Sequence, residues 1–226
     1  MSLGLIVERL RALYGTSTGL SGLAADLAVT DETGWHPADD LAGPLFDDLL
    51  TAAIRHWDAR PPAAAALAWK AYTYWVCLPF VIAWVSARGV PLLTGTNVLV
   101  RLDRPRALVT VGLRAGLPDA AAPEEAVRAL LGDHLTPLLE KIHAEVRVGK
   151  RPLLGTLAAN VAGVALRCAD AARTEQLLTA LGVDGLVDLV PEVRRRTCCL
   201  AFTLPRPKVC QDCCLGPVQV PGGSAP

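Results

Sequence analysis

Residues 61–88 read PPAAAALAWKAYTYWVCLPFVIAWVSAR, and this stretch decides the fold class. Pro61-Pro62 suits the first turn of a helix, because proline has no N–H to lose there and its φ is already helical. Alanine is the best helix former, and Lys70 is the only charged residue before Arg88. We therefore predict a long, buried helix that runs to about Arg88, with a kink or break at Pro79.

The same stretch raises the question of a membrane. Residues 71–87 carry no charge, and a helix that crosses a bilayer needs about 20 apolar residues. Polar residues and Pro79 interrupt the segment, which favours a core helix and leaves peripheral membrane association as the alternative. Glu8, Arg9 and Arg11 fall where the apolar core of a secretory signal would lie, so we expect a cytoplasmic protein.

Outward from this helix, apolar periodicity predicts further helices over 3–13, from near Pro44 to Trp57, from Pro123, from Thr136, and over 153–172, 175–181 and 186–190. The β-branched runs 98–100 and 107–111, separated by 103–106, predict a β-hairpin. The expected fold is α+β: a mainly helical body with a small β-hairpin or sheet and a cysteine-rich C-terminal segment. We assign the body to 1–190, the cysteine-rich segment to 191–220 and a disordered tail to 221–226.

Charge excludes one class of partner. The 226-residue chain has 22 Lys and Arg against 22 Asp and Glu, so its net charge is zero and nucleic acid is not expected as a partner. The acids gather between residues 26 and 58. The bases gather around the C-terminal segment, at Arg194, Arg195, Arg196, Arg206 and Lys208.

Five of the seven cysteines lie within residues 198–214, in the sequence CCLAFTLPRPKVCQDCC. Cys198-Cys199 is followed by ten residues, Cys210, two residues and Cys213. A cytosolic chain rarely holds such a group as disulfides, which remain the weaker alternative, so metal binding is the natural interpretation.

Two metals fit four thiolates. A [2Fe–2S] cluster takes two for each iron. A structural zinc takes all four on one ion, usually from C-x₂₋₄-C pairs, a rule that Cys210 and Cys213 obey and the adjacent Cys198-Cys199 does not. This spacing favours an iron–sulfur cluster, and a structural zinc site remains the alternative. The other two cysteines, Cys77 and Cys168, lie singly in apolar helices and are expected to be structural.

The C-C-x₁₀-C-x₂-C pattern, in the context RTCCL at 196–200, resembles the C-terminal signature of the FhuF-like ferric-siderophore reductases. The stretches HLTPL at 134–138 and KRPLLG at 150–155, through Ala159-Asn160, are similar to the body of that family. The resemblance implies that Cys198, Cys199, Cys210 and Cys213 ligate a [2Fe–2S] cluster. One departure is Cys214, where members of the family more often have proline, so Cys214 competes with Cys213 as a ligand.

The function implied by this resemblance is that of an iron–sulfur oxidoreductase. It passes one electron to Fe³⁺ in a siderophore of the hydroxamate type and releases Fe²⁺ inside the cell. The sequence has no G-x-G-x-x-G after a strand, so we expect an external electron donor such as a ferredoxin or flavodoxin. The alternative is a non-redox binding or assembly protein with structural zinc on the same cysteines.

Other candidate site residues are weaker. Trp69, Trp75, Trp84 and Arg196 are the first candidates for contact with the ferric chelate. The basic residues near the cysteines would stabilise a reduced cluster or dock an acidic partner. His36, His56, His134 and His143 form no recognisable motif and are expected on the surface or in the core.

Overall fold

The computed structural model describes residues 3–15, 20–86, 89–104, 107–120 and 122–215. Its helices are α1 (Leu3–Tyr14), α2 (Phe46–Trp57), α3 (Pro61–Val85), α4 (Pro123–Leu130), α5 (Thr136–Val146), α6 (Lys150–Ala165) and α7 (Ala171–Ala180). Its strands are β1 (Leu23–Val29), β2 (His36–Pro37), β3 (Val98–Arg104), β4 (Ala107–Arg114), β5 (Val187–Asp188) and β6 (Arg194–Arg195). Short helical turns lie at Ala38–Ala42, Leu131–Leu135, Asp184–Leu186 and Ala201–Thr203. The predicted α+β class is confirmed.

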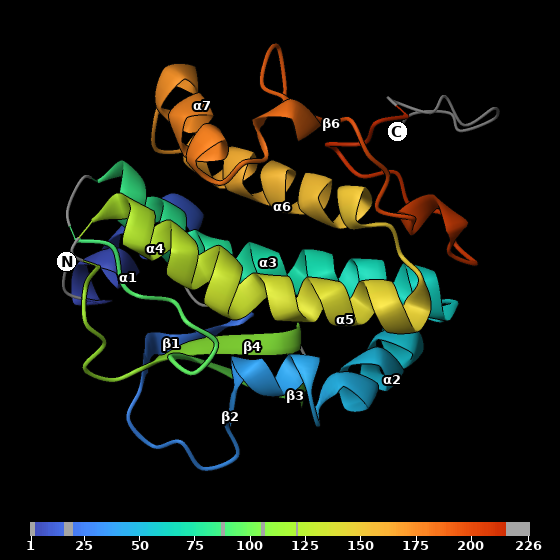
Figure 1. The fold of residues 1–226 in the computed structure, drawn as a ribbon, viewed down its shortest axis with the longest axis horizontal. Coiled ribbons are helices and arrows are strands. Elements are labelled where there is room, and N and C mark those ends of the chain that lie inside the picture. The colour runs from blue at the N-terminus through green and yellow to red at the C-terminus, as the bar shows by residue number, and fades with distance from the viewer. Residues whose placement is uncertain (1–2, 16–19, 87–88, 105–106, 121, 216–226) are drawn as a thin grey trace.

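Helix α3 lies at the centre of the fold. It packs against α6 on one side and β4 on the other, and α1, α2 and α5 also contact it (Figure 1). Among the described residues, α3 is the one helix long and apolar enough to span a membrane, yet 78% of its most apolar window is buried inside the fold. A core helix of a soluble protein passes the same test, so this is weak evidence for a membrane span.

The predicted hairpin is confirmed and is the middle of a larger sheet. The four strands run in the order β1-β4-β3-β2, with β1 parallel to β4 and the other pairs antiparallel. Sequence reasoning missed β1, whose burial does not alternate regularly and whose Leu27 has a positive φ of 60°. The sheet covers the face of α3 that lies away from α6 (Figure 1).

Helices α4 and α5 are joined by the π-helical turn Leu131–Leu135. In a regular helix the carbonyl of Asp133 would accept from the N–H of residue 137, but Pro137 has none. Gly95 donates to that carbonyl instead, at 3.4 Å, which ties the turn to the chain before β3.

Helix α3 is continuous through Pro79, which excludes a break there. Other local predictions were wrong in detail. The predicted helix over 186–190 is instead the end of a 3₁₀ turn and strand β5, because the adjacent β6 pairs with it and Pro191 disfavours a helical residue before it. Helix α7 begins at Ala171 and not at 175, since the side chain of Asp170 caps it by accepting from the N–H of Arg173 at 2.8 Å. The predicted tail over 221–226 lies outside the described residues.

Candidate metal centre at the C-terminal cysteines

The cysteine segment is held on α6 by the small sheet that precedes it. Strand β6 pairs with β5, and the N–H of Arg195 also donates to the carbonyl of Asp212 at 2.9 Å. The second backbone bond closes a loop over residues 195–212. This loop contains Cys198, Cys199 and Cys210, and Cys213 follows directly after it.

Glycine permits a close approach between this segment and α6. A Cβ placed on Gly155 would lie 2.1 Å from the hydroxyl oxygen of Thr197, far inside van der Waals contact. Thr197 itself is buried, and its hydroxyl has no hydrogen-bond partner among the described residues. Thr197, the residue before Cys198, is therefore in close contact with α6 at Gly155.

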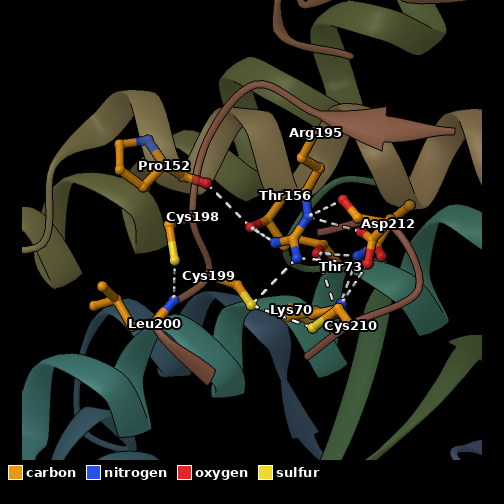
Figure 2. Close-up of polar contacts among 11 residues, drawn as sticks. Lys70, Thr73, Pro152, Thr156, Arg195, Cys198, Cys199, Leu200, Cys210 and Asp212 are labelled. Atoms are coloured by element: carbon orange, nitrogen blue, oxygen red, sulfur yellow. Dashed lines mark hydrogen bonds and ion pairs between the residues drawn. The ribbon is translucent and has the colours of Figure 1, made fainter. Parts of the chain in front are cut away.

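The structure brings two of the predicted sulfur ligands together. The Sγ atoms of Cys199 and Cys210 lie 3.4 Å apart (Figure 2). Two thiolates on one tetrahedral metal, with bonds of about 2.3 Å, are roughly 3.8 Å apart. This pair is therefore close to the spacing that a shared metal requires.

The other predicted ligands are near in sequence but are not gathered around that pair. The Sγ of Cys198 accepts a hydrogen bond from the N–H of Leu200 at 3.2 Å (Figure 2). Cys213 is buried, and its N–H donates to the carbonyl of Cys210 at 3.1 Å, which closes the turn between those two cysteines. Within the described ranges, no three His, Cys, Asp or Glu side chains are arranged to hold one metal ion.

A buried guanidinium adjoins the sulfur pair. Arg195 is only 1% exposed, and its Nη2 lies 3.2 Å from the Sγ of Cys199. Its Nε lies 2.7 Å from a carboxylate oxygen of Asp212, and its Nη1 donates to the hydroxyl of Thr156 at 3.4 Å (Figure 2). Since arginine stays protonated in proteins, the site has a permanent positive charge within hydrogen-bond distance of a sulfur.

This environment favours thiolate at Cys199. The hydrogen bond from Cys210, together with the charge of Arg195, outweighs the cost of burial and lowers the pKa of Cys199 well below that of a free thiol. The same hydrogen bond raises the pKa of Cys210, because Cys210 keeps the proton that it donates. Thiolate is the form that binds metal, so Cys199 is already prepared as a ligand.

A second cation joins the network from α3. The Nζ of Lys70 lies 3.3 Å from the other carboxylate oxygen of Asp212, so this acid bridges Lys70 and Arg195. Asn160 of α6 donates to the carbonyl of Lys70 at 3.0 Å and to the hydroxyl of Thr73 at 2.9 Å. The cysteine segment is thereby tied to α3 as well as to α6.

A pocket opens beside this network. Its volume is about 430 Å³, and it lies between α3, α6 and the segments 192–193 and 211–212. Its charged and polar lining residues are Lys70, Tyr74, Asn160, Arg167, Glu192, Gln211 and Asp212. Two bases and two acids balance in charge, and Asp212 belongs both to the pocket wall and to the Arg195 network.

The aromatic candidates do not line this pocket. Trp69 is completely buried and its Nε1 donates to the carbonyl of Leu153 at 2.8 Å, so it is a core residue and not a chelate contact. Trp75 packs over Gly22, and the Nε1 of Trp84 is buried. Arg196 is exposed and pairs with Asp188 at 2.5 Å.

Two predictions about lone residues are confirmed. Cys77 is fully buried in α3 and is a core residue, whereas Cys168 is half-buried and donates to the carbonyl of Val164 in α6. His134 is a buried core residue, hydrogen-bonded to the hydroxyl of Tyr72 and to the carbonyl of Leu93.

Sequence reasoning missed the part played by Lys70, Asn160 and Asp212. Lys70 is the single charge in residues 61–87, and Asp212 stands between two predicted ligands. The sequence therefore contained a signal for both residues, because each is a charged residue among apolar residues or cysteines. Their meeting could not be foreseen, because 142 residues separate them along the chain.

Comparison with protein-family models and with curated proteins finds no match to this chain. The site must therefore be interpreted from its own residues.

Proposed function

We propose that this protein is an intracellular iron–sulfur oxidoreductase that reduces Fe³⁺ in a siderophore, as the resemblance to the FhuF-like reductases implies. The observation that carries the proposal is the sulfur pair Cys199–Cys210, 3.4 Å apart and in contact with the buried charge of Arg195. A pair of thiolates beside a fixed cation is suited to an anionic metal centre.

The donor set fits a [2Fe–2S] cluster in type and number. Cys198, Cys199, Cys210 and Cys213 are all free thiols. Bound to them, a [2Fe–2S] cluster would supply a centre that accepts and gives up one electron. The residues around it would do the rest: Arg195 offsets negative charge, and the Leu200 N–H donates to the Cys198 sulfur.

The pocket beside Asp212 offers a place for the chelate. Three hydroxamate groups neutralise Fe³⁺, so such a complex has no large net charge, and the balanced lining of Lys70, Arg167, Glu192 and Asp212 suits a neutral ligand. At about 430 Å³ the pocket would hold the iron-bearing part of a siderophore with the remainder outside. Tyr74 and Asn160 would orient it through their polar groups.

The reaction would need no acid–base residue. Hard, anionic oxygen ligands bind Fe³⁺ far more tightly than Fe²⁺, so one electron added to the chelated iron is enough to release it. The electron would come from an external protein such as a ferredoxin or flavodoxin.

Metal analysis tests the proposal most directly. Protein purified without oxygen should contain two irons and two acid-labile sulfides in each chain and absorb visible light. Replacing Cys199 or Cys210 with serine should abolish the iron, while the matched changes Cys77→Ser and Cys168→Ser should leave it. If the purified protein is instead colourless and contains one zinc per chain, the reductase proposal is wrong. That result would favour the alternative, a binding protein with a structural zinc.

Activity needs a separate measurement. The reduced protein should be reoxidised by a ferric trihydroxamate such as ferrioxamine, and Fe²⁺ should then be trapped by a ferrous-specific chelator. If iron and sulfide are present but no ferric chelate reoxidises the protein, the cluster remains and the substrate assignment fails.

A further inference from the structure

The exposed large apolar side chains lie close to the cysteines in the sequence. In the part of the chain that the structure describes, the exposed large hydrophobic residues are Val190, Phe202, Val209 and Leu215, and all lie between 190 and 215. Phe202 is 44% exposed and Val209 43%, and both stand on the loop between Cys199 and Cys210. Clustered exposed apolar residues are typical of an interaction site.

Two basic residues accompany them on the same loop. Arg206 and Lys208 are exposed, and no ion pair joins either side chain to a carboxylate within the described ranges. The neighbouring bases differ, since Arg195 pairs with Asp212 and Arg196 with Asp188. The loop therefore presents positive charge that its own fold does not neutralise.

The last turn of α2 completes this surface. It meets the loop at a recess of about 390 Å³, lined by Arg55, His56, Trp57, Asp58, Leu204, Pro205, Arg206 and Lys208. Its lining includes the acid Asp58 against Arg206 and Lys208 of the loop. Exposed apolar residues, two bases without an ion pair and one wall of a recess therefore all belong to the loop that joins Cys199 to Cys210.

We propose that the loop 201–209 and the last turn of α2 form the docking surface for a small, acidic electron-transfer protein. This inference rests on the proposed function, because it places the donor that the function requires. Complementary charge would steer the two proteins together, and Phe202 and Val209 would be covered at contact. The bound donor gives up one electron and is oxidised, and the chelated Fe³⁺ gains one electron and becomes Fe²⁺.

The geometry gives donor and chelate separate access. The docking loop joins Cys199 to Cys210, whereas the chelate pocket is lined by Gln211 and Asp212, which join Cys210 to Cys213. The two recesses share no residue. A donor seated on the loop would therefore leave the chelate pocket open. A recess also suits a protruding side chain of a protein better than a flat bilayer surface.

Charge reversal tests the docking surface. The rate at which a reduced, acidic plant-type ferredoxin reduces the protein would be measured by stopped flow. For Arg206→Glu with Lys208→Glu, we expect the second-order rate constant to fall about ten-fold or more at low salt and to converge with the wild-type value at high salt. Reduction by dithionite, a small reagent that needs no docking, should be unchanged.

A matched control carries the same change of charge elsewhere. Arg9→Glu with Arg128→Glu alters exposed bases on α1 and α4, at the other end of the molecule from the cysteine segment (Figure 1). This variant should keep the wild-type rate. Association of the two oxidised proteins, followed by chemical-shift changes in the ferredoxin, gives a readout independent of turnover. It should weaken only in the loop variant.

Each outcome decides a different claim. If the purified protein holds no iron or sulfide, the proposed function fails, and the docking proposal fails with it. If iron and sulfide are present but the loop and control variants have the same ferredoxin rate, the docking surface alone is overturned. If the loop variant loses only its binding to vesicles containing phosphatidylglycerol, the occupant is a membrane and the proposal is likewise wrong.

Discussion

The guanidinium of Arg195 lies 3.2 Å from the sulfur of Cys199 and 2.7 Å from the carboxylate of Asp212. One buried cation therefore connects a predicted metal ligand to the wall of the neighbouring pocket. Reduction of a metal centre at these cysteines would add one negative charge, and Arg195 is placed to offset it.

Replacing Arg195 with methionine keeps much of the volume and removes the charge. We expect a more negative midpoint potential, because the reduced form loses its nearby cation. We also expect the free energy of unfolding to fall by roughly 1–3 kcal/mol, since hydrogen-bonding groups at Asp212 and Thr156 lose a buried partner. Redox titration followed by visible absorbance, and urea denaturation, measure the two effects.

The neighbouring arginine provides the control for that experiment. Arg196 is exposed, and its pair with Asp188 lies at the surface, where solvent screens the interaction, so Arg196→Met should leave the stability nearly unchanged. Its midpoint potential should match the wild type. Equal potentials for the Arg195 and Arg196 variants would show that the buried guanidinium does not tune the centre.

The contact between Gly155 and Thr197 predicts a second effect. A methyl group at 155 would lie 2.1 Å from the Thr197 hydroxyl, so Gly155→Ala should lower the unfolding free energy by about 1–3 kcal/mol through overpacking. In the same helix, nothing lies within 4 Å of a Cβ added to Gly163. Gly163→Ala should therefore stabilise the protein, by up to about 1 kcal/mol. Thermal denaturation of both variants gives the comparison.

A compensating change makes that prediction sharper. Thr197→Ala removes a buried hydroxyl that has no described partner and also removes the nearest atom to the added methyl. Combined with Gly155→Ala, it should recover part of the lost stability. Additive losses in the double variant would contradict the proposed overlap.

Sequence patterns were sufficient where a structure depends on nearby residues. The helix beginning at Pro61 and the hairpin around 103–106 were predicted because proline placement, helix-forming residues and β-branched runs act over a few positions. Patterns failed where pairing over a distance decides the outcome. Residues 187–188 form a strand because β6 pairs with them. Pro191 disfavours a helical conformation at the residue before it, so the predicted helix over 186–190 does not form.

The candidate site was predictable in part for the same reason. The spacing from Cys198 to Cys213 marks them as candidate ligands, and only the fold brings the Cys199 and Cys210 sulfurs together. The burial of Arg195 could not be foreseen, because it lies among three consecutive arginines of which its two neighbours are exposed. Lys70 and Trp69 are adjacent, yet the structure assigns the former to the site and the latter to the core.

His134 predicts a dependence of stability on pH. The carbonyl of Leu93 can only accept, so Nδ1 of His134 carries the proton, and Nε2 accepts from the hydroxyl of Tyr72. Burial lowers the pKa of His134 to about 4, below the model-peptide value of about 6.5. The unfolded chain therefore binds more protons between these values, and stability present above pH 6.5 is lost as the pH falls toward 4, by on the order of 3 kcal/mol.

Urea denaturation between pH 4 and pH 7 measures this loss. A glutamine at 134 can donate to Leu93 and accept from Tyr72 without titrating, so His134→Gln should flatten the decline over that range. His143 is exposed on α5, and His143→Gln should leave the decline in place. An equally steep decline in the His134 variant would assign the acid sensitivity to other groups.

Cys213 and Cys214 compete for one ligand position, and their surroundings differ. Cys213 is buried, and its N–H closes a turn onto the carbonyl of Cys210, whereas Cys214 is half-buried and burial raises its pKa. The closed turn fixes Cys213 at the two-residue spacing from Cys210 that a C-x₂-C ligand pair has. Cys213→Ser should therefore abolish bound iron, and Cys214→Ser should retain it with an unchanged visible spectrum. The reverse result would assign the fourth ligand to Cys214.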